Sequence, residues 1–315
     1  MTSQAGSILN VGVVGVGHLG KHHARLLAAM PGVRLVGVAD LMLERAQAAV
    51  AGTTAEAMTD YHALLGRVDA VVVAVPTVAH LAVARPFLER GTAVLVEKPM
   101  AASVAEATEM LELATRSGAT LAVGHTERFN PAMAVALPSL KTPRFIEVHR
   151  MSGFPERSLD IDVIFDVMIH DLDIIMAVDR SDVVKVEAVG VPVLTPKIDI
   201  CNARLKFASG CVANITASRI SREPVRKVRF FQPDMYVSID YAAQEIEAWR
   251  LRPRPGERPV IEGGPVEVVK DEPLKRELED FVDAVRQRRA PGVTGADGLR
   301  ALQLATRVAE AVEAG

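Results

Sequence analysis

The sequence has few of the features that mark secreted or metal-dependent proteins. Only two of its 315 residues are cysteines, Cys201 and Cys211. Both lie in what we interpret as one hairpin that turns at Ser209-Gly210, where they are too far apart to form a disulfide. We expect both to be small buried apolar side chains. The chain also has no Cys-x-x-Cys pair, and we expect no metal site.

Long apolar runs and a strong net charge are also absent. No apolar stretch approaches the roughly 18 to 20 residues that span a bilayer, and no early basic segment precedes one. The formal net charge of −3 favours neither nucleic acid nor an anionic membrane surface as a partner. We therefore expect a cytoplasmic protein that binds neither. A length of 315 residues with 49% hydrophobic residues suits two globular domains.

A glycine-rich motif follows the first apolar run, residues 8–14. In a strand, turn and helix of this kind, the first glycine permits the tight turn and the second lets the backbone approach a pyrophosphate. The third glycine lets the helix pack on its strand, and the N–H groups at the helix start face the phosphates. We expect the cofactor to be bound here by Gly15, Gly17, His18, Leu19 and Gly20.

An acidic residue, Asp40, ends the second predicted strand, residues 33–39, twenty positions after Gly20. This is where a dinucleotide-binding fold places the carboxylate that binds the adenosine ribose hydroxyls. An N-cap role for Asp40 in the following helix is compatible with this. Because a carboxylate repels a 2′-phosphate, we expect NAD over NADP, with Arg45 as a distant compensating cation.

The next central strand, residues 69–75, ends at a short polar segment. In a doubly wound sheet the carboxyl ends of the strands border the ligand crevice. We therefore expect Pro76, Thr77 and His80 to contact the cofactor. Thr77 is equally well placed to cap the following helix, and His80 is equally well placed to be a packed histidine.

Strand 93–96 ends in Glu97-Lys98-Pro99. Pro99 favours an extended conformation at Lys98, which would hold the ammonium out into the crevice. Beside a nicotinamide, this ammonium would bond to a substrate hydroxyl and stabilise charge on the oxygen as the hydride leaves. We expect Glu97 and Lys98 in the cofactor site, with Lys98 also catalytic. A surface salt bridge of Glu97 is the alternative.

The order of elements divides the chain near residue 123. Residues 1–123 are predicted to form six strands in alternation with helices, a doubly wound parallel Rossmann sheet. Residues 124–315 contain strand-like runs in series, typical of a mainly antiparallel sheet in an α+β domain. The predicted strands are 145–151, 183–191, 198–207, 212–217, 225–231, 235–239 and 245–251, with loops at 252–256 and 263–265.

One predicted helix, residues 161–175, has polar residues at i, i+4, i+8 and i+11, and therefore on one face: Asp162, Asp166, His170 and Asp173. A solvated face would be expected to carry Lys and Glu, whereas a histidine among short aspartates suits proton transfer. Asp166 would orient His170 and stabilise its charge as a general base. An ordinary helix surface is the alternative.

In order and spacing these motifs, with Gly124–Pro131, resemble the Gfo/Idh/MocA oxidoreductases, the family of glucose-fructose oxidoreductase and inositol 2-dehydrogenase. The resemblance implies a Rossmann domain, a second domain with a large open sheet often used for oligomer contact, and a tightly held nicotinamide cofactor. The lysine of the family's Glu-Lys-Pro motif falls on Lys98, and its Asp-x-x-x-His pair falls on Asp166 and His170. We therefore expect a homodimer or homotetramer.

The combination of Gly124–Pro131, Asp166–Asp171 and Arg222–Lys227 is similar to a bacterial subgroup that includes UDP-N-acetylglucosamine 3-dehydrogenases. It implies that a diphosphate would meet one or more of Arg128, Arg222, Arg226 and Lys227. We expect Arg128, Asn130 and Asp173 at the substrate. Basic residues that solvate a sheet edge are the alternative. Phe165 and Met168 depart from the glycines common in the family, which leaves the shape of the pocket open.

The expected reaction is hydride transfer between NAD and a secondary alcohol of a sugar or nucleotide sugar. One alternative is a dehydrogenase or reductase of another substrate class, such as cyclitols, or a biliverdin-like or opine-type enzyme. Another is a non-catalytic NAD-dependent sensor, since a fold does not fix a function.

Overall fold

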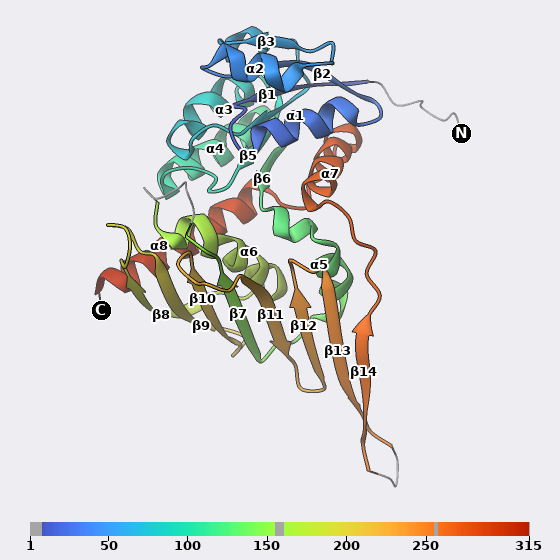
Figure 1. The fold of residues 1–315 in the computed structure, drawn as a ribbon, viewed down its shortest axis with the longest axis vertical. Coiled ribbons are helices and arrows are strands. Elements are labelled where there is room, and N and C mark those ends of the chain that lie inside the picture. Colours follow the sequence, from blue (N-terminus) through green and yellow to red (C-terminus); the bar gives the residue numbers. More distant parts are fainter. Residues whose placement is uncertain (1–7, 155–160, 255–257, 315) are drawn as a thin grey trace. The chain divides into compact units, whose positions relative to one another are not determined.

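The computed structural model describes residues 8–154, 161–254 and 258–314. The chain forms two compact units, coloured along the sequence in Figure 1. The first contains Met1–His125 and Leu274–Leu299, and the second contains Thr126–Pro273 and Arg300–Gly315. The sequence-based boundary assigned residues 274–299 to the second domain, whereas here they belong to the first.

The first unit is built on a six-stranded sheet in the order β3-β2-β1-β4-β5-β6, and every pair of neighbours is parallel. The predicted doubly wound Rossmann sheet is confirmed. Its strand order reverses between β1 and β4, which is where such sheets bind ligands. Six strands were predicted, but none was assigned to the residues of β3. The strands are β1 (Leu9–Val14), β2 (Val33–Ala39), β3 (Glu56–Met58), β4 (Ala70–Val73), β5 (Ala93–Glu97) and β6 (Leu121–Gly124).

Helices cover this sheet and bury its β-branched strands. They are α1 (Gly20–Ala29), α2 (Leu43–Val50), α3 (His80–Leu88) and α4 (Val104–Ser117), with short 3-10 turns η1 (Tyr61–Leu64) and η2 (Thr77–Ala79). Helix α7 (Pro273–Gln287) packs into the same core because its apolar stripe, Leu278, Phe281 and Val282, is buried with Leu9 and Leu27. This packing explains why α7 belongs to the first unit although it follows the second in sequence.

The second unit is built on an eight-stranded sheet in the order β14-β13-β12-β11-β7-β10-β9-β8. Neighbours are antiparallel except β7 and β10, so the prediction of a large, mainly antiparallel sheet is confirmed. The strands are β7 (Phe145–Met151), β8 (Val183–Val191), β9 (Ile200–Phe207), β10 (Val212–Ser218), β11 (Val225–Phe231), β12 (Met235–Asp240), β13 (Glu245–Arg252) and β14 (Val260–Val266).

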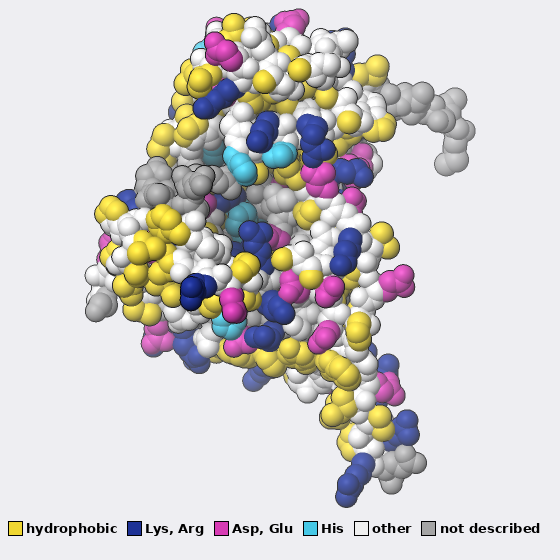
Figure 2. Space-filling model, in the orientation of Figure 1, with side chains coloured by type: hydrophobic (Ala, Val, Ile, Leu, Met, Phe, Trp, Pro, Cys, Tyr) yellow, Lys and Arg dark blue, Asp and Glu magenta, His cyan; other side chains and the backbone are white. Residues whose placement is uncertain are grey.

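Strand β14 contradicts the prediction of a loop at residues 263–265. Gly263 pairs with Trp249 of β13 at a φ of 150°, and a Cβ on Gly263 would lie 2.0 Å from the carbonyl oxygen of Ala248. The glycine therefore permits a close approach of two strands and does not mark a turn. Figure 2 shows Lys and Arg side chains at the far ends of β13 and β14, where Arg252 and Arg258 are exposed.

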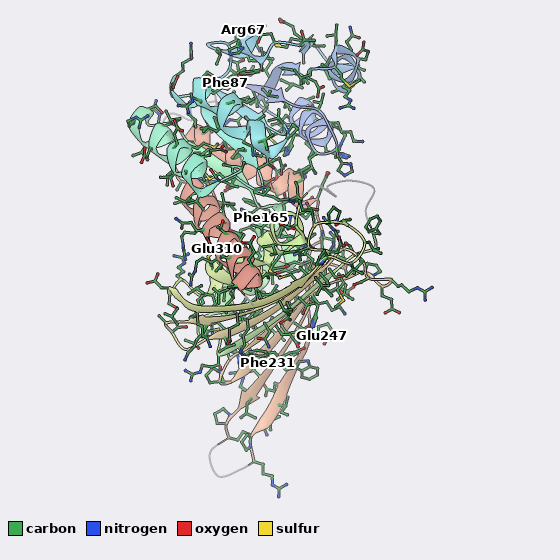
Figure 3. The ribbon with its side chains drawn as sticks, turned by 90° about the vertical axis from the view of Figure 1, so that its left-hand side faces the viewer. Arg67, Phe87, Phe165, Phe231, Glu247 and Glu310 are labelled. Carbon is green, nitrogen blue, oxygen red and sulfur yellow. The ribbon has the colours of Figure 1, made fainter. Side chains whose placement is uncertain are left out.

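Helices cover one face of this sheet. They are η3 (Thr126–Phe129), α5 (Pro131–Ala136), η4 (Leu137–Ser139), the π-helix η5 (Ile164–Met168), α6 (Ile169–Val178) and the end of α8 (Gly295–Ala314). Figure 3 shows Phe165 on the helix side of the sheet and Phe231 and Glu247 on the other side. Both cysteines are buried in the core of this unit. Among the described residues, none of the helices has the length and apolar character needed to span a bilayer.

Candidate active site

The glycine-rich turn joins β1 to α1, and its backbone is tightly packed at Gly15 and Gly20. Gly15 has a φ of 85°, and a Cβ on Gly20 would lie 1.9 Å from the carbonyl oxygen of Gly15. Gly17 differs, because a Cβ placed on it would meet no atom within 4 Å. Two glycines therefore shape the turn, while Gly17 leaves open space beside the backbone N–H groups at the start of α1. A pyrophosphate requires this space.

Asp40, at the end of β2, is tied to the same turn. Its carboxylate accepts the N–H of Val16 at 2.8 Å and the N–H of Met42 at 2.9 Å. A carboxylate has about four acceptor positions, so ribose hydroxyls can still bind. A cavity of about 480 Å³ adjoins the turn. It is lined by Val16, Gly17, His18, Lys21, Arg45, Ala48 and Ala49. This turn, carboxylate and cavity fit an adenine dinucleotide.

The segment after β4 contains three of the predicted cofactor residues, with Pro76 just before η2, Thr77 in η2 and His80 at the start of α3. Thr77 begins η2 and is half-buried, and no hydrogen bond of its hydroxyl is found among the described residues, so the capping alternative is not realised. His80 is buried, with its Nε2 3.0 Å from the carbonyl oxygen of Val75 and its Nδ1 3.0 Å from that of Pro99. His80 therefore links the ends of β4 and β5. Burial lowers the pKa of its imidazole, against the raising effect of these carbonyls.

The end of β5 holds Glu97 and Lys98. Glu97 is buried, and its Oε1 lies 2.7 Å from Nε2 of His23 on α1, while its Oε2 accepts the N–H of Lys98 at 3.3 Å. Burial opposes ionisation, but His23 and Lys98 outweigh it and hold the pKa of Glu97 below its usual range. Glu97 is thus not a surface salt bridge. It connects the glycine-turn helix to the backbone of Lys98, and sequence reasoning did not identify His23.

The helix predicted over residues 161–175 begins with a π turn, in which the N–H of Ile169 donates to the carbonyl oxygen of Ile164. Asp162 precedes this turn, and its side chain accepts the N–H of Ile198 at 2.8 Å. The prediction that Asp162 shares a helix face with the other three polar residues is therefore wrong. Asp166 lies in the π turn and His170 in the first turn of α6, and both are half-buried. Such π turns occur frequently at functional sites.

Three predicted substrate residues are largely occupied with contacts inside the second unit. Arg128 donates to Asp173 through two nitrogens, at 2.6 and 2.9 Å, and Asp173 is buried. Asn130 caps α5 by accepting the N–H of Ala132, and its amide donates to the carbonyl oxygen of Tyr241. These contacts hold η3 against α6, and the start of α5 against the residue that follows β12. Direct contact with substrate remains a proposal for these three residues.

A buried charge cluster lies beside them. Arg150 of β7 donates to both oxygens of Asp171, at 2.7 and 2.8 Å, and to Glu127 at 2.9 Å. Its guanidinium carbon lies 5.3 Å from the centre of the Tyr241 ring. Asp171 follows His170 directly, so this cluster anchors the helix that holds the predicted base. The signal for it was the alternation of β7, which puts Arg150 on the buried face with Ile146 and Val148, where a charge needs partners.

Comparisons with known proteins agree with this arrangement. A family model described as an oxidoreductase family with an NAD-binding Rossmann fold matches residues 9–125. UDP-N-acetylglucosamine 3-dehydrogenase of Acidithiobacillus ferrooxidans is 38% identical over 97% of this chain and 98% of its own length. A solved structure of that enzyme superimposes with a TM-score of 0.91, covering 97% of this chain and 98% of the other. The chain belongs to the Gfo/Idh/MocA oxidoreductase family.

Membership of the Gfo/Idh/MocA family makes this chain an NAD-binding-fold oxidoreductase. A more distant relative, inositol 2-dehydrogenase of Rhizobium meliloti, is 25% identical over 96% of this chain and 96% of its own length. Dehydrogenases acting on alcohol groups are thus found among both close and distant relatives. The expected oxidoreductase class is confirmed.

Proposed function

We propose that this protein is an NAD-dependent dehydrogenase acting on the 3-hydroxyl of UDP-N-acetylglucosamine or a closely similar nucleotide sugar. The observation that supports this most strongly is the 38% identity to UDP-N-acetylglucosamine 3-dehydrogenase over nearly the whole of both chains. Cyclitol dehydrogenases are related at 25% identity over similar lengths. A nucleotide sugar is therefore favoured over a cyclitol.

The proposed chemistry assigns one task to each of three residues. In the oxidising direction, His170 takes the proton of the sugar hydroxyl, and Asp166 orients the imidazole and stabilises its positive charge. Lys98 donates a hydrogen bond to the same oxygen and stabilises its developing negative charge. The bound nicotinamide supplies the hydride acceptor. Glu97 and His80 position the loop that bears Lys98, because Glu97 accepts the N–H of Lys98 and His80 contacts the carbonyl oxygen of Pro99.

Turnover with UDP-N-acetylglucosamine and NAD, followed by the absorbance of the reduced nicotinamide, tests this proposal. We expect Lys98→Ala and His170→Ala each to lower kcat by roughly 10²- to 10⁴-fold, with NAD affinity retained. Matched controls are the exposed Lys185→Ala and His62→Ala, whose side chains pair with Glu187 and Asp60. Normal rates in both active-site variants would refute the mechanism, and an inactive wild type would refute the substrate.

For the cofactor we propose NAD over NADP, because the Asp40 carboxylate would repel a 2′-phosphate. Lys21 and Arg45 line the neighbouring cavity and are available to pair with a 2′-phosphate once that repulsion is removed. We therefore expect kcat/KM to be higher with NAD than with NADP. Asp40→Ala should bring these two values of kcat/KM closer together. A wild type that prefers NADP would contradict this assignment.

We further propose a homo-oligomer, on the basis of the family resemblance. Several apolar side chains on the outer strands of the second unit's sheet are exposed, among them Val189, Trp249 and Ile261. A second copy of the chain would cover such side chains. Sedimentation equilibrium checks this, since a monomer at micromolar concentration would contradict it.

A further inference from the structure

The register of strand β11 decides which of its basic residues face the helices. Arg226 pairs directly with Arg150 of β7, and side chains directly opposite each other in an antiparallel pair lie on the same face. Arg150 contacts Asp171 of α6, so that face is the one covered by helices. The neighbouring Lys227 lies on the opposite face, where its ammonium is 3.3 Å from Asp240.

Arg226 also differs from the basic residues around it in its contacts. Arg150 is neutralised by Asp171 and Glu127, and Arg128 by Asp173. Arg226 is exposed, and no side-chain hydrogen bond or ion pair of its guanidinium is found among the described residues. Its backbone, in contrast, is fixed, since its carbonyl oxygen accepts the N–H of Tyr241. A well-anchored strand thus presents an arginine with donors to spare.

The charge of Arg226 acts on the helix that carries the predicted base. Burial raises the pKa of Asp171, and the positive charges of Arg150 and Arg226 oppose that rise. Asp171 follows His170 in the chain. The guanidinium of Arg226 therefore belongs to the surroundings of α6.

We propose that Arg226 binds the diphosphate of the nucleotide-sugar substrate. This inference rests on the proposed function, in which a diphosphate is attached at C1 of the sugar while the reacting hydroxyl is at C3. The diphosphate must therefore lie within one sugar ring of the group that takes the hydroxyl proton. A guanidinium pairs with phosphate oxygens through two parallel N–H donors, which gives both affinity and orientation. Arg226 is thus a specificity-determining residue that favours nucleotide sugars over free sugars.

An alternative role is charge balance. Asp171 and Glu127 together carry one more negative charge than Arg150 neutralises, and Arg226 would offset it. In that case removing Arg226 would lower stability and leave ligand affinity unchanged. The two roles therefore predict different measurements.

Calorimetric titration with UDP, and with inorganic pyrophosphate as a second probe, tests the inference. We expect Arg226→Ala to weaken UDP binding roughly 10- to 100-fold, as for a lost charged hydrogen bond. Arg226→Lys should recover part of the affinity, because it keeps the charge and loses the paired geometry. Arg229→Ala is the matched control on the same strand, because Arg229 pairs with Glu147 on the opposite face of the sheet, and it should change affinity less than about twofold.

The turnover assay separates this inference from the proposed function. If Arg226→Ala leaves the UDP affinity and the KM for UDP-N-acetylglucosamine unchanged while the wild type is active, the inference fails and the function stands. If UDP binding depends on Arg226 but the wild type does not oxidise the sugar, the diphosphate site stands and the reaction fails. A wild type that binds no UDP overturns the inference, and activity alone then decides the function.

Discussion

The candidate sites of the two units are formed by different groups, mainly backbone in the first unit and mainly charged side chains in the second. In the first, the cofactor region is mostly backbone, with a turn shaped by Gly15 and Gly20, open space at Gly17 and a carboxylate that binds a main-chain N–H. In the second, the candidate substrate region is held by buried side-chain ion pairs around Arg150. A backbone site depends on the absence of side chains, whereas an ion-pair site depends on every partner being present. Substitutions should therefore fail in different ways in the two units.

The largest expected effect is in the second unit, for Arg150→Met. This change leaves Asp171 and Glu127 without their cation in a buried place, which typically costs about 3–5 kcal/mol of unfolding free energy. Arg229→Met removes a half-exposed partner of Glu147 on the neighbouring strand and should cost about 0–1 kcal/mol. Urea unfolding followed by fluorescence of the single tryptophan, Trp249, reports on this unit. Equal losses in both variants would show that the cluster contributes no more than a surface pair.

In the first unit, two glycines should separate folding from binding. Gly20→Ala puts a methyl group against the carbonyl of Gly15, and we expect the free energy of unfolding to fall by about 1–3 kcal/mol. NAD binding should be lost as well. Gly17→Ala meets open space, so its thermal midpoint should stay near that of the wild type while its affinity for NAD falls. Thermal unfolding without NAD and titration with NAD measure the two effects. Tight NAD binding by Gly17→Ala would contradict a pyrophosphate at this turn.

A smaller, pH-dependent effect is expected at Asp199 in the second unit. Burial alone would raise its pKa, but three backbone N–H groups and Arg219 hold it far below its usual value. Because the folded pKa is depressed, the stabilisation is complete above the unfolded value near 4 and is lost as the pH falls. Asp199→Asn should therefore lower stability at pH 7 and flatten its acid dependence. Parallel wild-type and variant curves between about pH 7 and 3 would contradict this.

The smallest effect concerns the two thiols. Burial raises the pKa of Cys201 and of Cys211 to about 12, so little thiolate exists near neutral pH. We expect both to react with iodoacetamide far more slowly in the folded protein than in urea. Mass spectrometry of the alkylated peptides checks this, with the urea-unfolded sample as the control. Rapid labelling of either residue in the native protein would show that the core opens easily.

Most of the fold could be predicted because its signals are local. The buried run of β4, the glycine turn and the series of strands in the second half each lie within a few neighbouring residues. Strand β14 was missed because Gly263 and Gly264 have the composition of a turn, and their close approach to β13 depends on tertiary pairing. The π turn at Ile164–Met168 was missed for a similar reason, since an α-helical period fits the same residues.

The candidate site was less predictable in the second unit than in the first. The glycines and Asp40 keep a fixed spacing along β1, the glycine-rich turn, α1 and β2. The cluster of Glu127, Arg150, Asp171 and Tyr241 comes from segments up to 114 positions apart, which only folding brings together. The sequence therefore predicted Lys98 after a strand and His170 in a helix. It did not predict which residues hold that strand end and that helix in place.

The position of α7 has a consequence for biosynthesis. Its apolar stripe completes the core around Leu9 and Leu27, yet it is translated only after the whole of β7 to β14. The nascent Rossmann half therefore exposes the apolar surface that α7 covers until nearly the end of synthesis. A nonsense mutation before residue 273 would leave the Rossmann half permanently without α7. Chaperone capture or degradation of the truncated chain is the expected result.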